Sequence, residues 1–180
     1  TRTCDLAWQR EYFSWLREHC DPNLGMSYRG RTDKDTPDHH MYGWFHYLFN
    51  HEYAKQPLAY PERVIDSCID LYTKNGLPST FGMYCGFIEV DWVYCMTRSL
   101  RQTNYRYDEA MSCLEDFAEK FVGYLTQDDY TVNNRFNDFF NALHCLFGTA
   151  CCLAELQQTF RGKLKSDKPM KLVLDRRPFI

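Results

Sequence analysis

The sequence lacks the features that mark three common classes of protein. No unbroken apolar stretch approaches the roughly 20 residues that a bilayer span needs, and no charged start followed by an apolar run marks a signal peptide. Basic residues form no stripe, since 21 Lys and Arg are mixed with 24 Asp and Glu, for a formal net charge of -3. We therefore expect a soluble protein that spans no membrane and binds no nucleic acid.

Motifs for metal and nucleophilic chemistry are also missing. The chain has no Cys-x-x-Cys pair, no His-x-x-x-His pair with a catalytic Glu and no Gly-x-Ser-x-Gly elbow. We therefore predict no metal site and no cofactor. Most of the nine cysteines fall inside apolar helical patterns, which is typical of reduced thiols in a protein core. This use of cysteine predicts a reducing compartment, and hence a cytoplasmic location.

The apolar residues that are present recur with helical spacing. Segments at about 5–19, 61–74 and 107–125 are amphipathic, with one apolar stripe each. Segments at about 41–53, 87–100 and 136–156 are apolar nearly all round. A helix that is apolar on most sides must be covered on most sides. The alternation therefore predicts an outer layer of amphipathic helices over an inner layer of buried ones.

These helices predict an all-α fold of three consecutive α/α hairpins. We expect a single domain over residues 1–165 and a C-terminal tail over residues 166–180. A weak internal repeat at a shift of about 47 residues agrees with a hairpin array. The connections from outer to inner helices are long, and those from inner to outer helices are short. In an up-down array the long connections share one rim, where binding groups collect on rigid scaffolds.

Two carboxylates, Glu89 and Asp91, lie in the most apolar segment of the chain. Burial raises the pKa of a carboxyl and a nearby cation lowers it, so separate environments could create an acid and a base. The structural alternative is that one residue caps the helix start and the other pairs with Arg98, Arg101 or Arg135. Residues two positions apart point about 200° apart on a helix, so both cannot face one cavity.

Further polar side chains gather where the first and third inner helices start. They are Asp38, His39, His40, Asn134, Arg135 and Asp138. Asp38 suits an N-cap. Adjacent His39 and His40 cannot both ligate one ion from a regular helix, so we interpret them as rim or packing side chains.

Outer helices that alternate with inner ones, with carboxylates at the inner starts, resemble the α/α toroid proteins, particularly the six-hairpin glycosidases. In the unsaturated glucuronyl hydrolases of that group, acid/base aspartates lie near inner-helix starts and aromatic rings stack on sugar faces. The comparable carboxylates here are Asp38, Asp91 and Asp138, and the possible sugar platforms are Trp44, Tyr84 and Trp92. A six-hairpin ring has twice as many helices as we predict, which implies a half-ring, a fragment or an open array.

We therefore expect a glycoside hydrolase-like, carbohydrate-active enzyme, or part of one, that binds a polar small molecule or saccharide. Asp91 is the leading acid/base candidate, with Glu89 or Asp138 as its partner. The alternatives are a noncatalytic helical protein-interaction module and a terpenoid- or prenyl-processing toroid. An unclosed array leaves apolar end faces, so we also expect a homodimer or association with the remainder of a longer chain.

Overall fold

The computed structural model describes residues 5–27, 36–74, 87–126 and 139–176. Its α-helices are α1 (Leu6–Glu18), α2 (Pro37–Ala54), α3 (Pro61–Thr73), α5 (Phe87–Leu100), α6 (Tyr107–Leu125) and α8 (Phe139–Thr159). A short 3-10 helix, η1 (Leu174–Arg176), follows them. Within these ranges no named strand forms, so the predicted all-α class is confirmed.

Helix α2 begins earlier than the apolar pattern predicts. Pro37 occupies the first turn, where its missing N–H costs nothing and its fixed φ suits a helix. The N-cap is therefore Thr36, and the prediction that Asp38 is the N-cap is wrong. Asp38 lies in the first turn, where its negative charge faces the positive end of the helix dipole. His39 and His40 are consequently part of α2 rather than of the loop before it.

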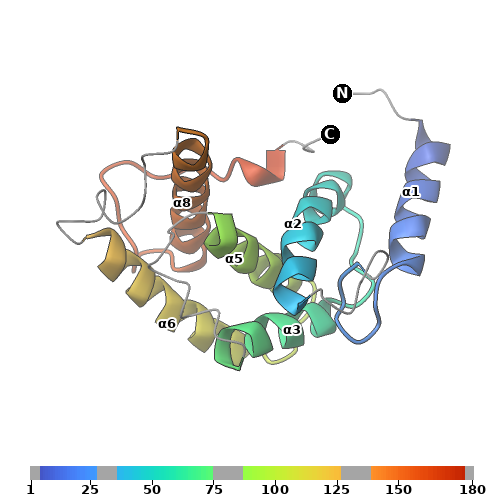
Figure 1. Cartoon of the computed structure of the whole chain (residues 1–180), viewed down its shortest axis with the longest axis horizontal. Helices are drawn as coiled ribbons and strands as arrows, with labels where there is room; N and C mark the ends of the chain where they lie inside the picture. Colours follow the sequence, from blue (N-terminus) through green and yellow to red (C-terminus); the bar gives the residue numbers. More distant parts are fainter. Residues whose placement is uncertain (1–4, 28–35, 75–86, 127–138, 177–180) are drawn as a thin grey trace.

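Helix α5 is the centre of the structure and contacts α2, α3, α6 and α8. In Figure 1, α1, α3 and α6 follow the right and lower edges of the molecule, and α2, α5 and α8 lie inside or above them. Contacts of α5 with α2 and α8 hold the inner helices together, and α3 contacts α6 in the outer layer. The described helices are therefore arranged around α5, whereas the inner and outer layers and the half-ring of a toroid remain predictions.

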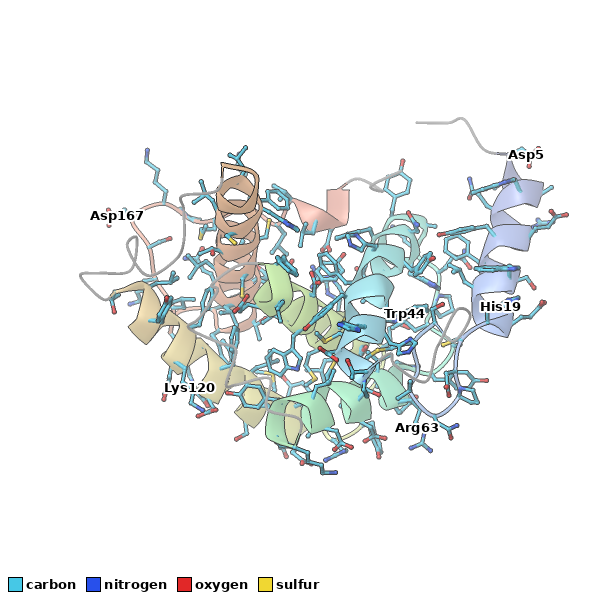
Figure 2. All side chains as sticks on the ribbon, in the orientation of Figure 1. Asp5, His19, Trp44, Arg63, Lys120 and Asp167 are labelled. Atoms are coloured by element: carbon cyan, nitrogen blue, oxygen red, sulfur yellow. The ribbon has the colours of Figure 1, made fainter. Side chains whose placement is uncertain are left out.

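Burial along α5 matches its central position. Every residue from Glu89 to Ser99 is buried. The indole of Trp92 stacks on the ring of Tyr72 with 4.9 Å between centroids, and its Nε1 donates to the carbonyl of Cys68 at 2.9 Å. Side chains fill the space between the helices, as Figure 2 shows for Trp44 on α2. The inner layer is therefore a packed aromatic core.

The two end helices are less covered than the central ones. On α8, Leu143, Leu146 and Phe147 are 53%, 56% and 46% exposed, although the sequence predicts burial nearly all round. Of the described helices, α5 alone packs closely against α8, so the opposite face stays open. Leu6 and Trp8 are similarly exposed on α1. Sequence periodicity identified the apolar faces, but it could not show that no described helix covers these faces of α1 and α8.

The last described residues return to the helices. Leu174 is buried, and η1 contacts α2. Asp175 forms ion pairs with Arg98 and Arg101 of α5 and the turn after it. The stretch that we predicted as a C-terminal tail therefore contributes to the core in its described part.

Two observations bear on the wider expectations. No helix in the described ranges is long and apolar enough to cross a membrane. No disulfide joins any of the seven cysteines in these ranges, in agreement with the predicted thiols.

Candidate functional site

The starts of the three inner helices meet through their aromatic rings. The Phe87 ring of α5 stacks on the His144 ring of α8, with 4.6 Å between centroids and 11° between planes. The same Phe87 ring meets the edge of Tyr42 of α2 at 6.4 Å. We name this region the helix-start cluster, and its members are Asp38, Tyr42, Phe87, Glu89, Asp91 and His144.

The two carboxylates of α5 are buried in the helix-start cluster. Glu89 is 1% exposed and Asp91 is 3% exposed. Burial, and then the negative charge of Glu89, raise the pKa of Asp91 to about 8. Within the described residues, Asp91 makes no side-chain hydrogen bond or ion pair that would stabilise its charge. Asp91 is therefore mostly protonated at neutral pH.

The pKa of Asp38 is shifted in the opposite direction from the pKa of Asp91. Its carboxylate accepts hydrogen bonds from the hydroxyls of Thr36 and Tyr42, the latter at 3.3 Å. Burial raises the pKa of Asp38, but these hydrogen bonds and the charge of His39 outweigh burial and hold the pKa below its ordinary value. Asp38 is therefore ionised at neutral pH.

Tyr42 connects the carboxylates of the cluster. Burial raises the pKa of its hydroxyl, and the negative charges of Asp38, Asp91 and Glu89 raise that pKa further. Charges act on a group in this way only over short separations. Three carboxylates from two helices therefore act on one hydroxyl, and Asp38 among them accepts a hydrogen bond from it.

Glu89 and Asp91 nevertheless act on different neighbours. Burial, and then the charge of Glu89, raise the pKa of Cys145 on α8. Burial, Cys68 and then Asp91 raise the pKa of Cys95 on α5 itself. This agrees with residues that point to different sides of one helix.

The described arginines do not neutralise the carboxylates of the helix-start cluster. Arg98 donates from Nη1 and Nη2 to both carboxylate oxygens of Glu155, at 2.8 and 2.6 Å, and from Nη2 to Asp175 at 2.7 Å. Arg101 pairs with Glu52 at 2.5 Å and with Asp175 at 3.2 Å. The alternative that Glu89 or Asp91 pairs with an arginine therefore receives no support from Arg98 or Arg101.

A second set of charges surrounds the buried Arg98 and Glu155, and we name it the arginine cluster: Glu52, Arg98, Arg101, Glu155 and Asp175. Burial alone lowers the pKa of a guanidinium, but the hydrogen bonds and charge of Glu155 outweigh it and raise the pKa of Arg98. The guanidinium also lies 4.0 Å from the centroid of the Tyr94 ring. Arg98 therefore has several partners despite being 1% exposed.

The other predicted site residues are buried in the core, lie near the start of α2 or fall outside the described ranges. Trp44 and Trp92 are 1% and 0% exposed, so their rings belong to the core, and we do not include them in the proposed site. His39 is exposed beside Tyr42, and Nδ1 of His40 lies 3.1 Å from the carbonyl oxygen of Ser27. Four predicted residues lie outside the described ranges: Tyr84, Asn134, Arg135 and Asp138.

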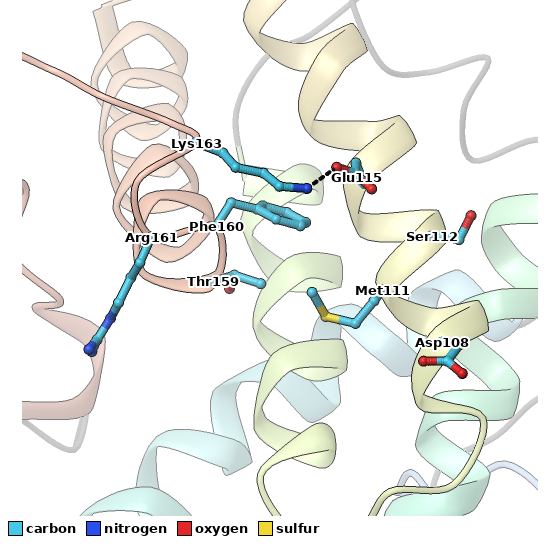
Figure 3. A pocket seen from close by; sticks show the side chains of 8 residues that line it. All are labelled: Asp108, Met111, Ser112, Glu115, Thr159, Phe160, Arg161 and Lys163. Carbon is cyan, nitrogen blue, oxygen red and sulfur yellow. Dashed lines mark hydrogen bonds and ion pairs between the residues drawn. The ribbon is translucent and has the colours of Figure 1, made fainter.

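A separate groove lies between α6 and the end of α8. It consists of two hollows of about 460 and 440 Å³ that share Glu115, Phe160 and Lys163. Figure 3 shows the first hollow, in which Lys163 pairs with Glu115 at 2.6 Å beside Phe160 and Met111. The paired side chains are at least half exposed, so their attraction is weakened by water. The groove has a partly apolar lining and is open to solvent.

Sequence reasoning overlooked Tyr42 and Phe87 as site residues. Tyr42 follows Asp38 by four positions, and this spacing places both side chains on one face of a helix.

No protein-family model, curated protein or solved structure matches the chain. The geometry of the helix-start cluster is therefore the basis for assigning a function.

Proposed function

We propose that the chain is a glycoside hydrolase-like, carbohydrate-active protein, or part of one, in which Asp91 is the general acid. The supporting observation is a carboxyl group that is 3% exposed, has a pKa of about 8 and has no ionic partner among the described residues. A general acid must hold its proton at the working pH and then give it to the leaving oxygen. Asp91 meets the first of these requirements at pH 7.

A second carboxylate is needed as base or nucleophile. Glu89 is one of the two predicted candidates and its charge acts on Asp91, but the two side chains point to different sides of α5 and cannot face one cavity. Asp138 remains a predicted alternative outside the described ranges. Unequal environments for two nearby carboxyl groups are the usual way in which one is kept protonated and the other ionised.

The aromatic members of the cluster are suited to a sugar ring. Phe87 is 36% exposed and lies between Tyr42 and His144, which is also exposed. Apolar ring faces with a few polar groups around them are typical of small-molecule sites. We therefore assign sugar contact to Phe87 and His144 in place of the two buried tryptophans.

Turnover of a panel of disaccharides and aryl glycosides by Asp91→Asn tests this proposal. We expect turnover of disaccharides to fall about 100-fold or more, because general acid catalysis contributes that much. The loss should be smaller for dinitrophenyl glycosides, because dinitrophenolate leaves without a proton. In the unchanged protein, kcat/KM should fall as the pH rises through about 8, where Asp91 loses its proton.

Asp167→Asn is the matched control, because Asp167 is exposed at the outer edge of the molecule and the charge change is the same (Figure 2). It should retain normal turnover. The proposal fails if Asp91→Asn hydrolyses disaccharides at the normal rate, or if the unchanged protein hydrolyses no member of the panel.

A noncatalytic helical interaction module is the second candidate, and the groove between α6 and α8 supports it. Met111 and Phe160 offer an apolar surface of the kind that receives one face of an amphipathic helix. Helical peptides selected on the protein should then lose binding in Phe160→Asp and keep it in Asp91→Asn. The terpenoid- or prenyl-processing alternative remains a prediction, because Asp128 and Asp129, an acidic pair that superficially resembles the aspartate cluster of terpene cyclases, lie outside the described ranges.

We also propose that the chain associates through the ends of its helix array. The exposed Leu143, Leu146 and Phe147 on α8, together with Trp8 on α1, support this proposal. Light scattering at micromolar concentration should give a mass above the 21.5 kDa of one chain, and Leu146→Glu should reduce it.

A further inference from the structure

We propose that the segment after α8 docks the protein on the surface of an anionic membrane. We name residues 161–171 the lysine loop, and its basic residues are Arg161, Lys163, Lys165, Lys168 and Lys171. The loop follows the end of α8, whereas the helix-start cluster lies at the start of that helix. Docking through this loop therefore does not depend on the proposed carbohydrate chemistry.

The lysine loop concentrates positive charge in a chain that is acidic as a whole. Its five basic residues are accompanied by one acidic residue, Asp167, so the loop carries +4 while the whole chain carries -3. The residues outside the loop therefore carry a net charge of -7. Exposed charges more than about 10 Å apart are largely screened at 0.1 M salt, so the acidic remainder does not prevent the loop from binding an anionic surface.

Three lysines of the loop have no acidic partner within the described part of the chain. Lys165, Lys168 and Lys171 are exposed and form no ion pair with a described carboxylate. Lys163 differs from them, because it pairs with Glu115 at 2.6 Å. The three unpaired ammonium groups are therefore free to bind an external anion.

One side chain of α8 holds the loop in place. Nε2 of Gln157 donates to Oγ of Ser166 at 2.8 Å, and Oε1 of Gln157 accepts from the backbone N–H of Met170 at 2.8 Å. Beyond the loop, Leu174 is buried and fixes the chain again. Figure 2 shows Asp167, in the middle of the loop, at the outer edge of the molecule. The lysines are thus presented on a held backbone, and less conformational entropy is lost when they bind.

Apolar side chains beside the lysines favour a lipid surface as the partner. Met170 is 36% exposed, and Val173, two residues after the loop, is 45% exposed. Apolar side chains enter the boundary between headgroups and acyl chains, while neighbouring lysines attract anionic headgroups. A nucleic acid backbone would use the charge of the loop but not its apolar side chains.

The kind of basic residue favours the same partner. Four of the five basic residues are lysines. A lysine ammonium is a point charge on a flexible stem, which suits a diffuse anionic surface, whereas the planar fork of arginine suits bidentate binding of individual phosphates.

Sedimentation with lipid vesicles tests the proposal. One set of vesicles is neutral phosphatidylcholine, and the other also contains about 30% phosphatidylserine, an anionic lipid. We expect the protein to sediment at 0.1 M salt with the anionic vesicles and not with the neutral ones. Raising the salt to 1 M should release it, because the Debye length falls from about 10 to about 3 Å.

Replacing the three unpaired lysines measures how much of the binding belongs to the loop. The triple variant Lys165→Gln, Lys168→Gln, Lys171→Gln should bind anionic vesicles about 100-fold more weakly, because each lysine near the surface contributes about fivefold. The matched control removes the same charge from exposed positions elsewhere, and its binding should stay within about twofold. Its substitutions are Arg10→Gln, Arg17→Gln and Lys55→Gln.

Two single variants separate the charge from the apolar contact. Asp167→Asn removes the acidic residue of the loop and should strengthen binding about fivefold. Met170→Ser keeps the backbone N–H that Gln157 accepts from, and it should weaken binding to vesicles about threefold through the lost apolar contact.

Several outcomes would overturn the proposal: sedimentation with neither set of vesicles, equal sedimentation with both, or a triple lysine variant that binds as well as the control triple. Single-stranded DNA and polyglutamate serve as the competing anions. If either binds more tightly than the anionic vesicles and loses binding in the triple lysine variant, the partner is not a lipid surface. Turnover of glycosides is measured in none of these experiments, so the proposed function stands or fails separately.

Discussion

Helix α5 buries Glu89 and Asp91 near its start and Arg98 about two turns later, and the two regions treat their charges differently. At the start, burial and then the charge of Glu89 raise the pKa of Asp91 to about 8. At the end, Arg98 donates two hydrogen bonds to Glu155 and two to Asp175. Burial alone therefore does not distinguish Asp91 from Arg98, whereas the ion-pair partners of Arg98 do.

The arginine cluster should contribute to stability in the way expected of a satisfied network. Removing one member of a buried ion pair is strongly destabilising, since it leaves an uncompensated charge in the interior. In the helix-start cluster, by contrast, replacing the buried acid should increase stability. Its buried acid is held in place by the surrounding fold, and replacing it with a neutral side chain should relieve an electrostatic cost.

The largest effect should come from Arg98→Met, which leaves Glu155 buried without its cation. We expect a loss of about 3–5 kcal/mol in the free energy of unfolding, measured by urea denaturation. Arg63→Met is the control, because Arg63 pairs with Asp66 while 54% exposed, and it should cost less than about 1 kcal/mol. Similar losses in the two variants would contradict the assignment of the arginine cluster to stability.

An effect of opposite sign should come from Asp91→Asn, and it should depend on pH. The pKa of Asp91 is about 8 in the folded protein and about 3.9 in an unfolded chain, so between these values the unfolded chain has lost a proton that the folded protein still holds. Stability is therefore lost as the pH rises from about 4 to about 8. Asn cannot ionise, so the variant should match the unchanged protein near pH 4, and its advantage should grow by about 1.4 kcal/mol for each pH unit up to about pH 8.

Urea denaturation at several pH values measures this difference, with Asp167→Asn as the control at an exposed position. A stability difference that does not vary with pH would show that Asp91 is ionised in the folded protein.

The sequence predicted the helices well because helical periodicity is a local property. Helices α5 and α6 begin and end at the predicted residues. The start of α2 was misplaced because the pattern was followed from its first apolar residue, while Pro37 already fits the first turn. Local pattern also identified Glu89 and Asp91, since carboxylates in an apolar run are conspicuous.

Long-range pairing could not be read from the sequence. Arg98 is separated from Glu155 by 57 positions and from Asp175 by 77, and Asp175 lies in a segment that we predicted as a tail. The same limit affected Trp44 and Trp92, because an aromatic residue in an apolar helix does not show whether its ring face is covered. Only the packing of the helices shows which residues pair with Arg98 and that the two tryptophan rings are covered.

The central claim is that Asp91 holds its proton at neutral pH in the helix-start cluster. Carbon-13 NMR of the aspartate side-chain carboxyls as a function of pH measures this directly, and the resonance that disappears in Asp91→Asn identifies the residue. We predict that this carboxyl titrates near pH 8. Titration of every aspartate below about pH 5 would place Asp91 in its ordinary range and contradict its role as the general acid.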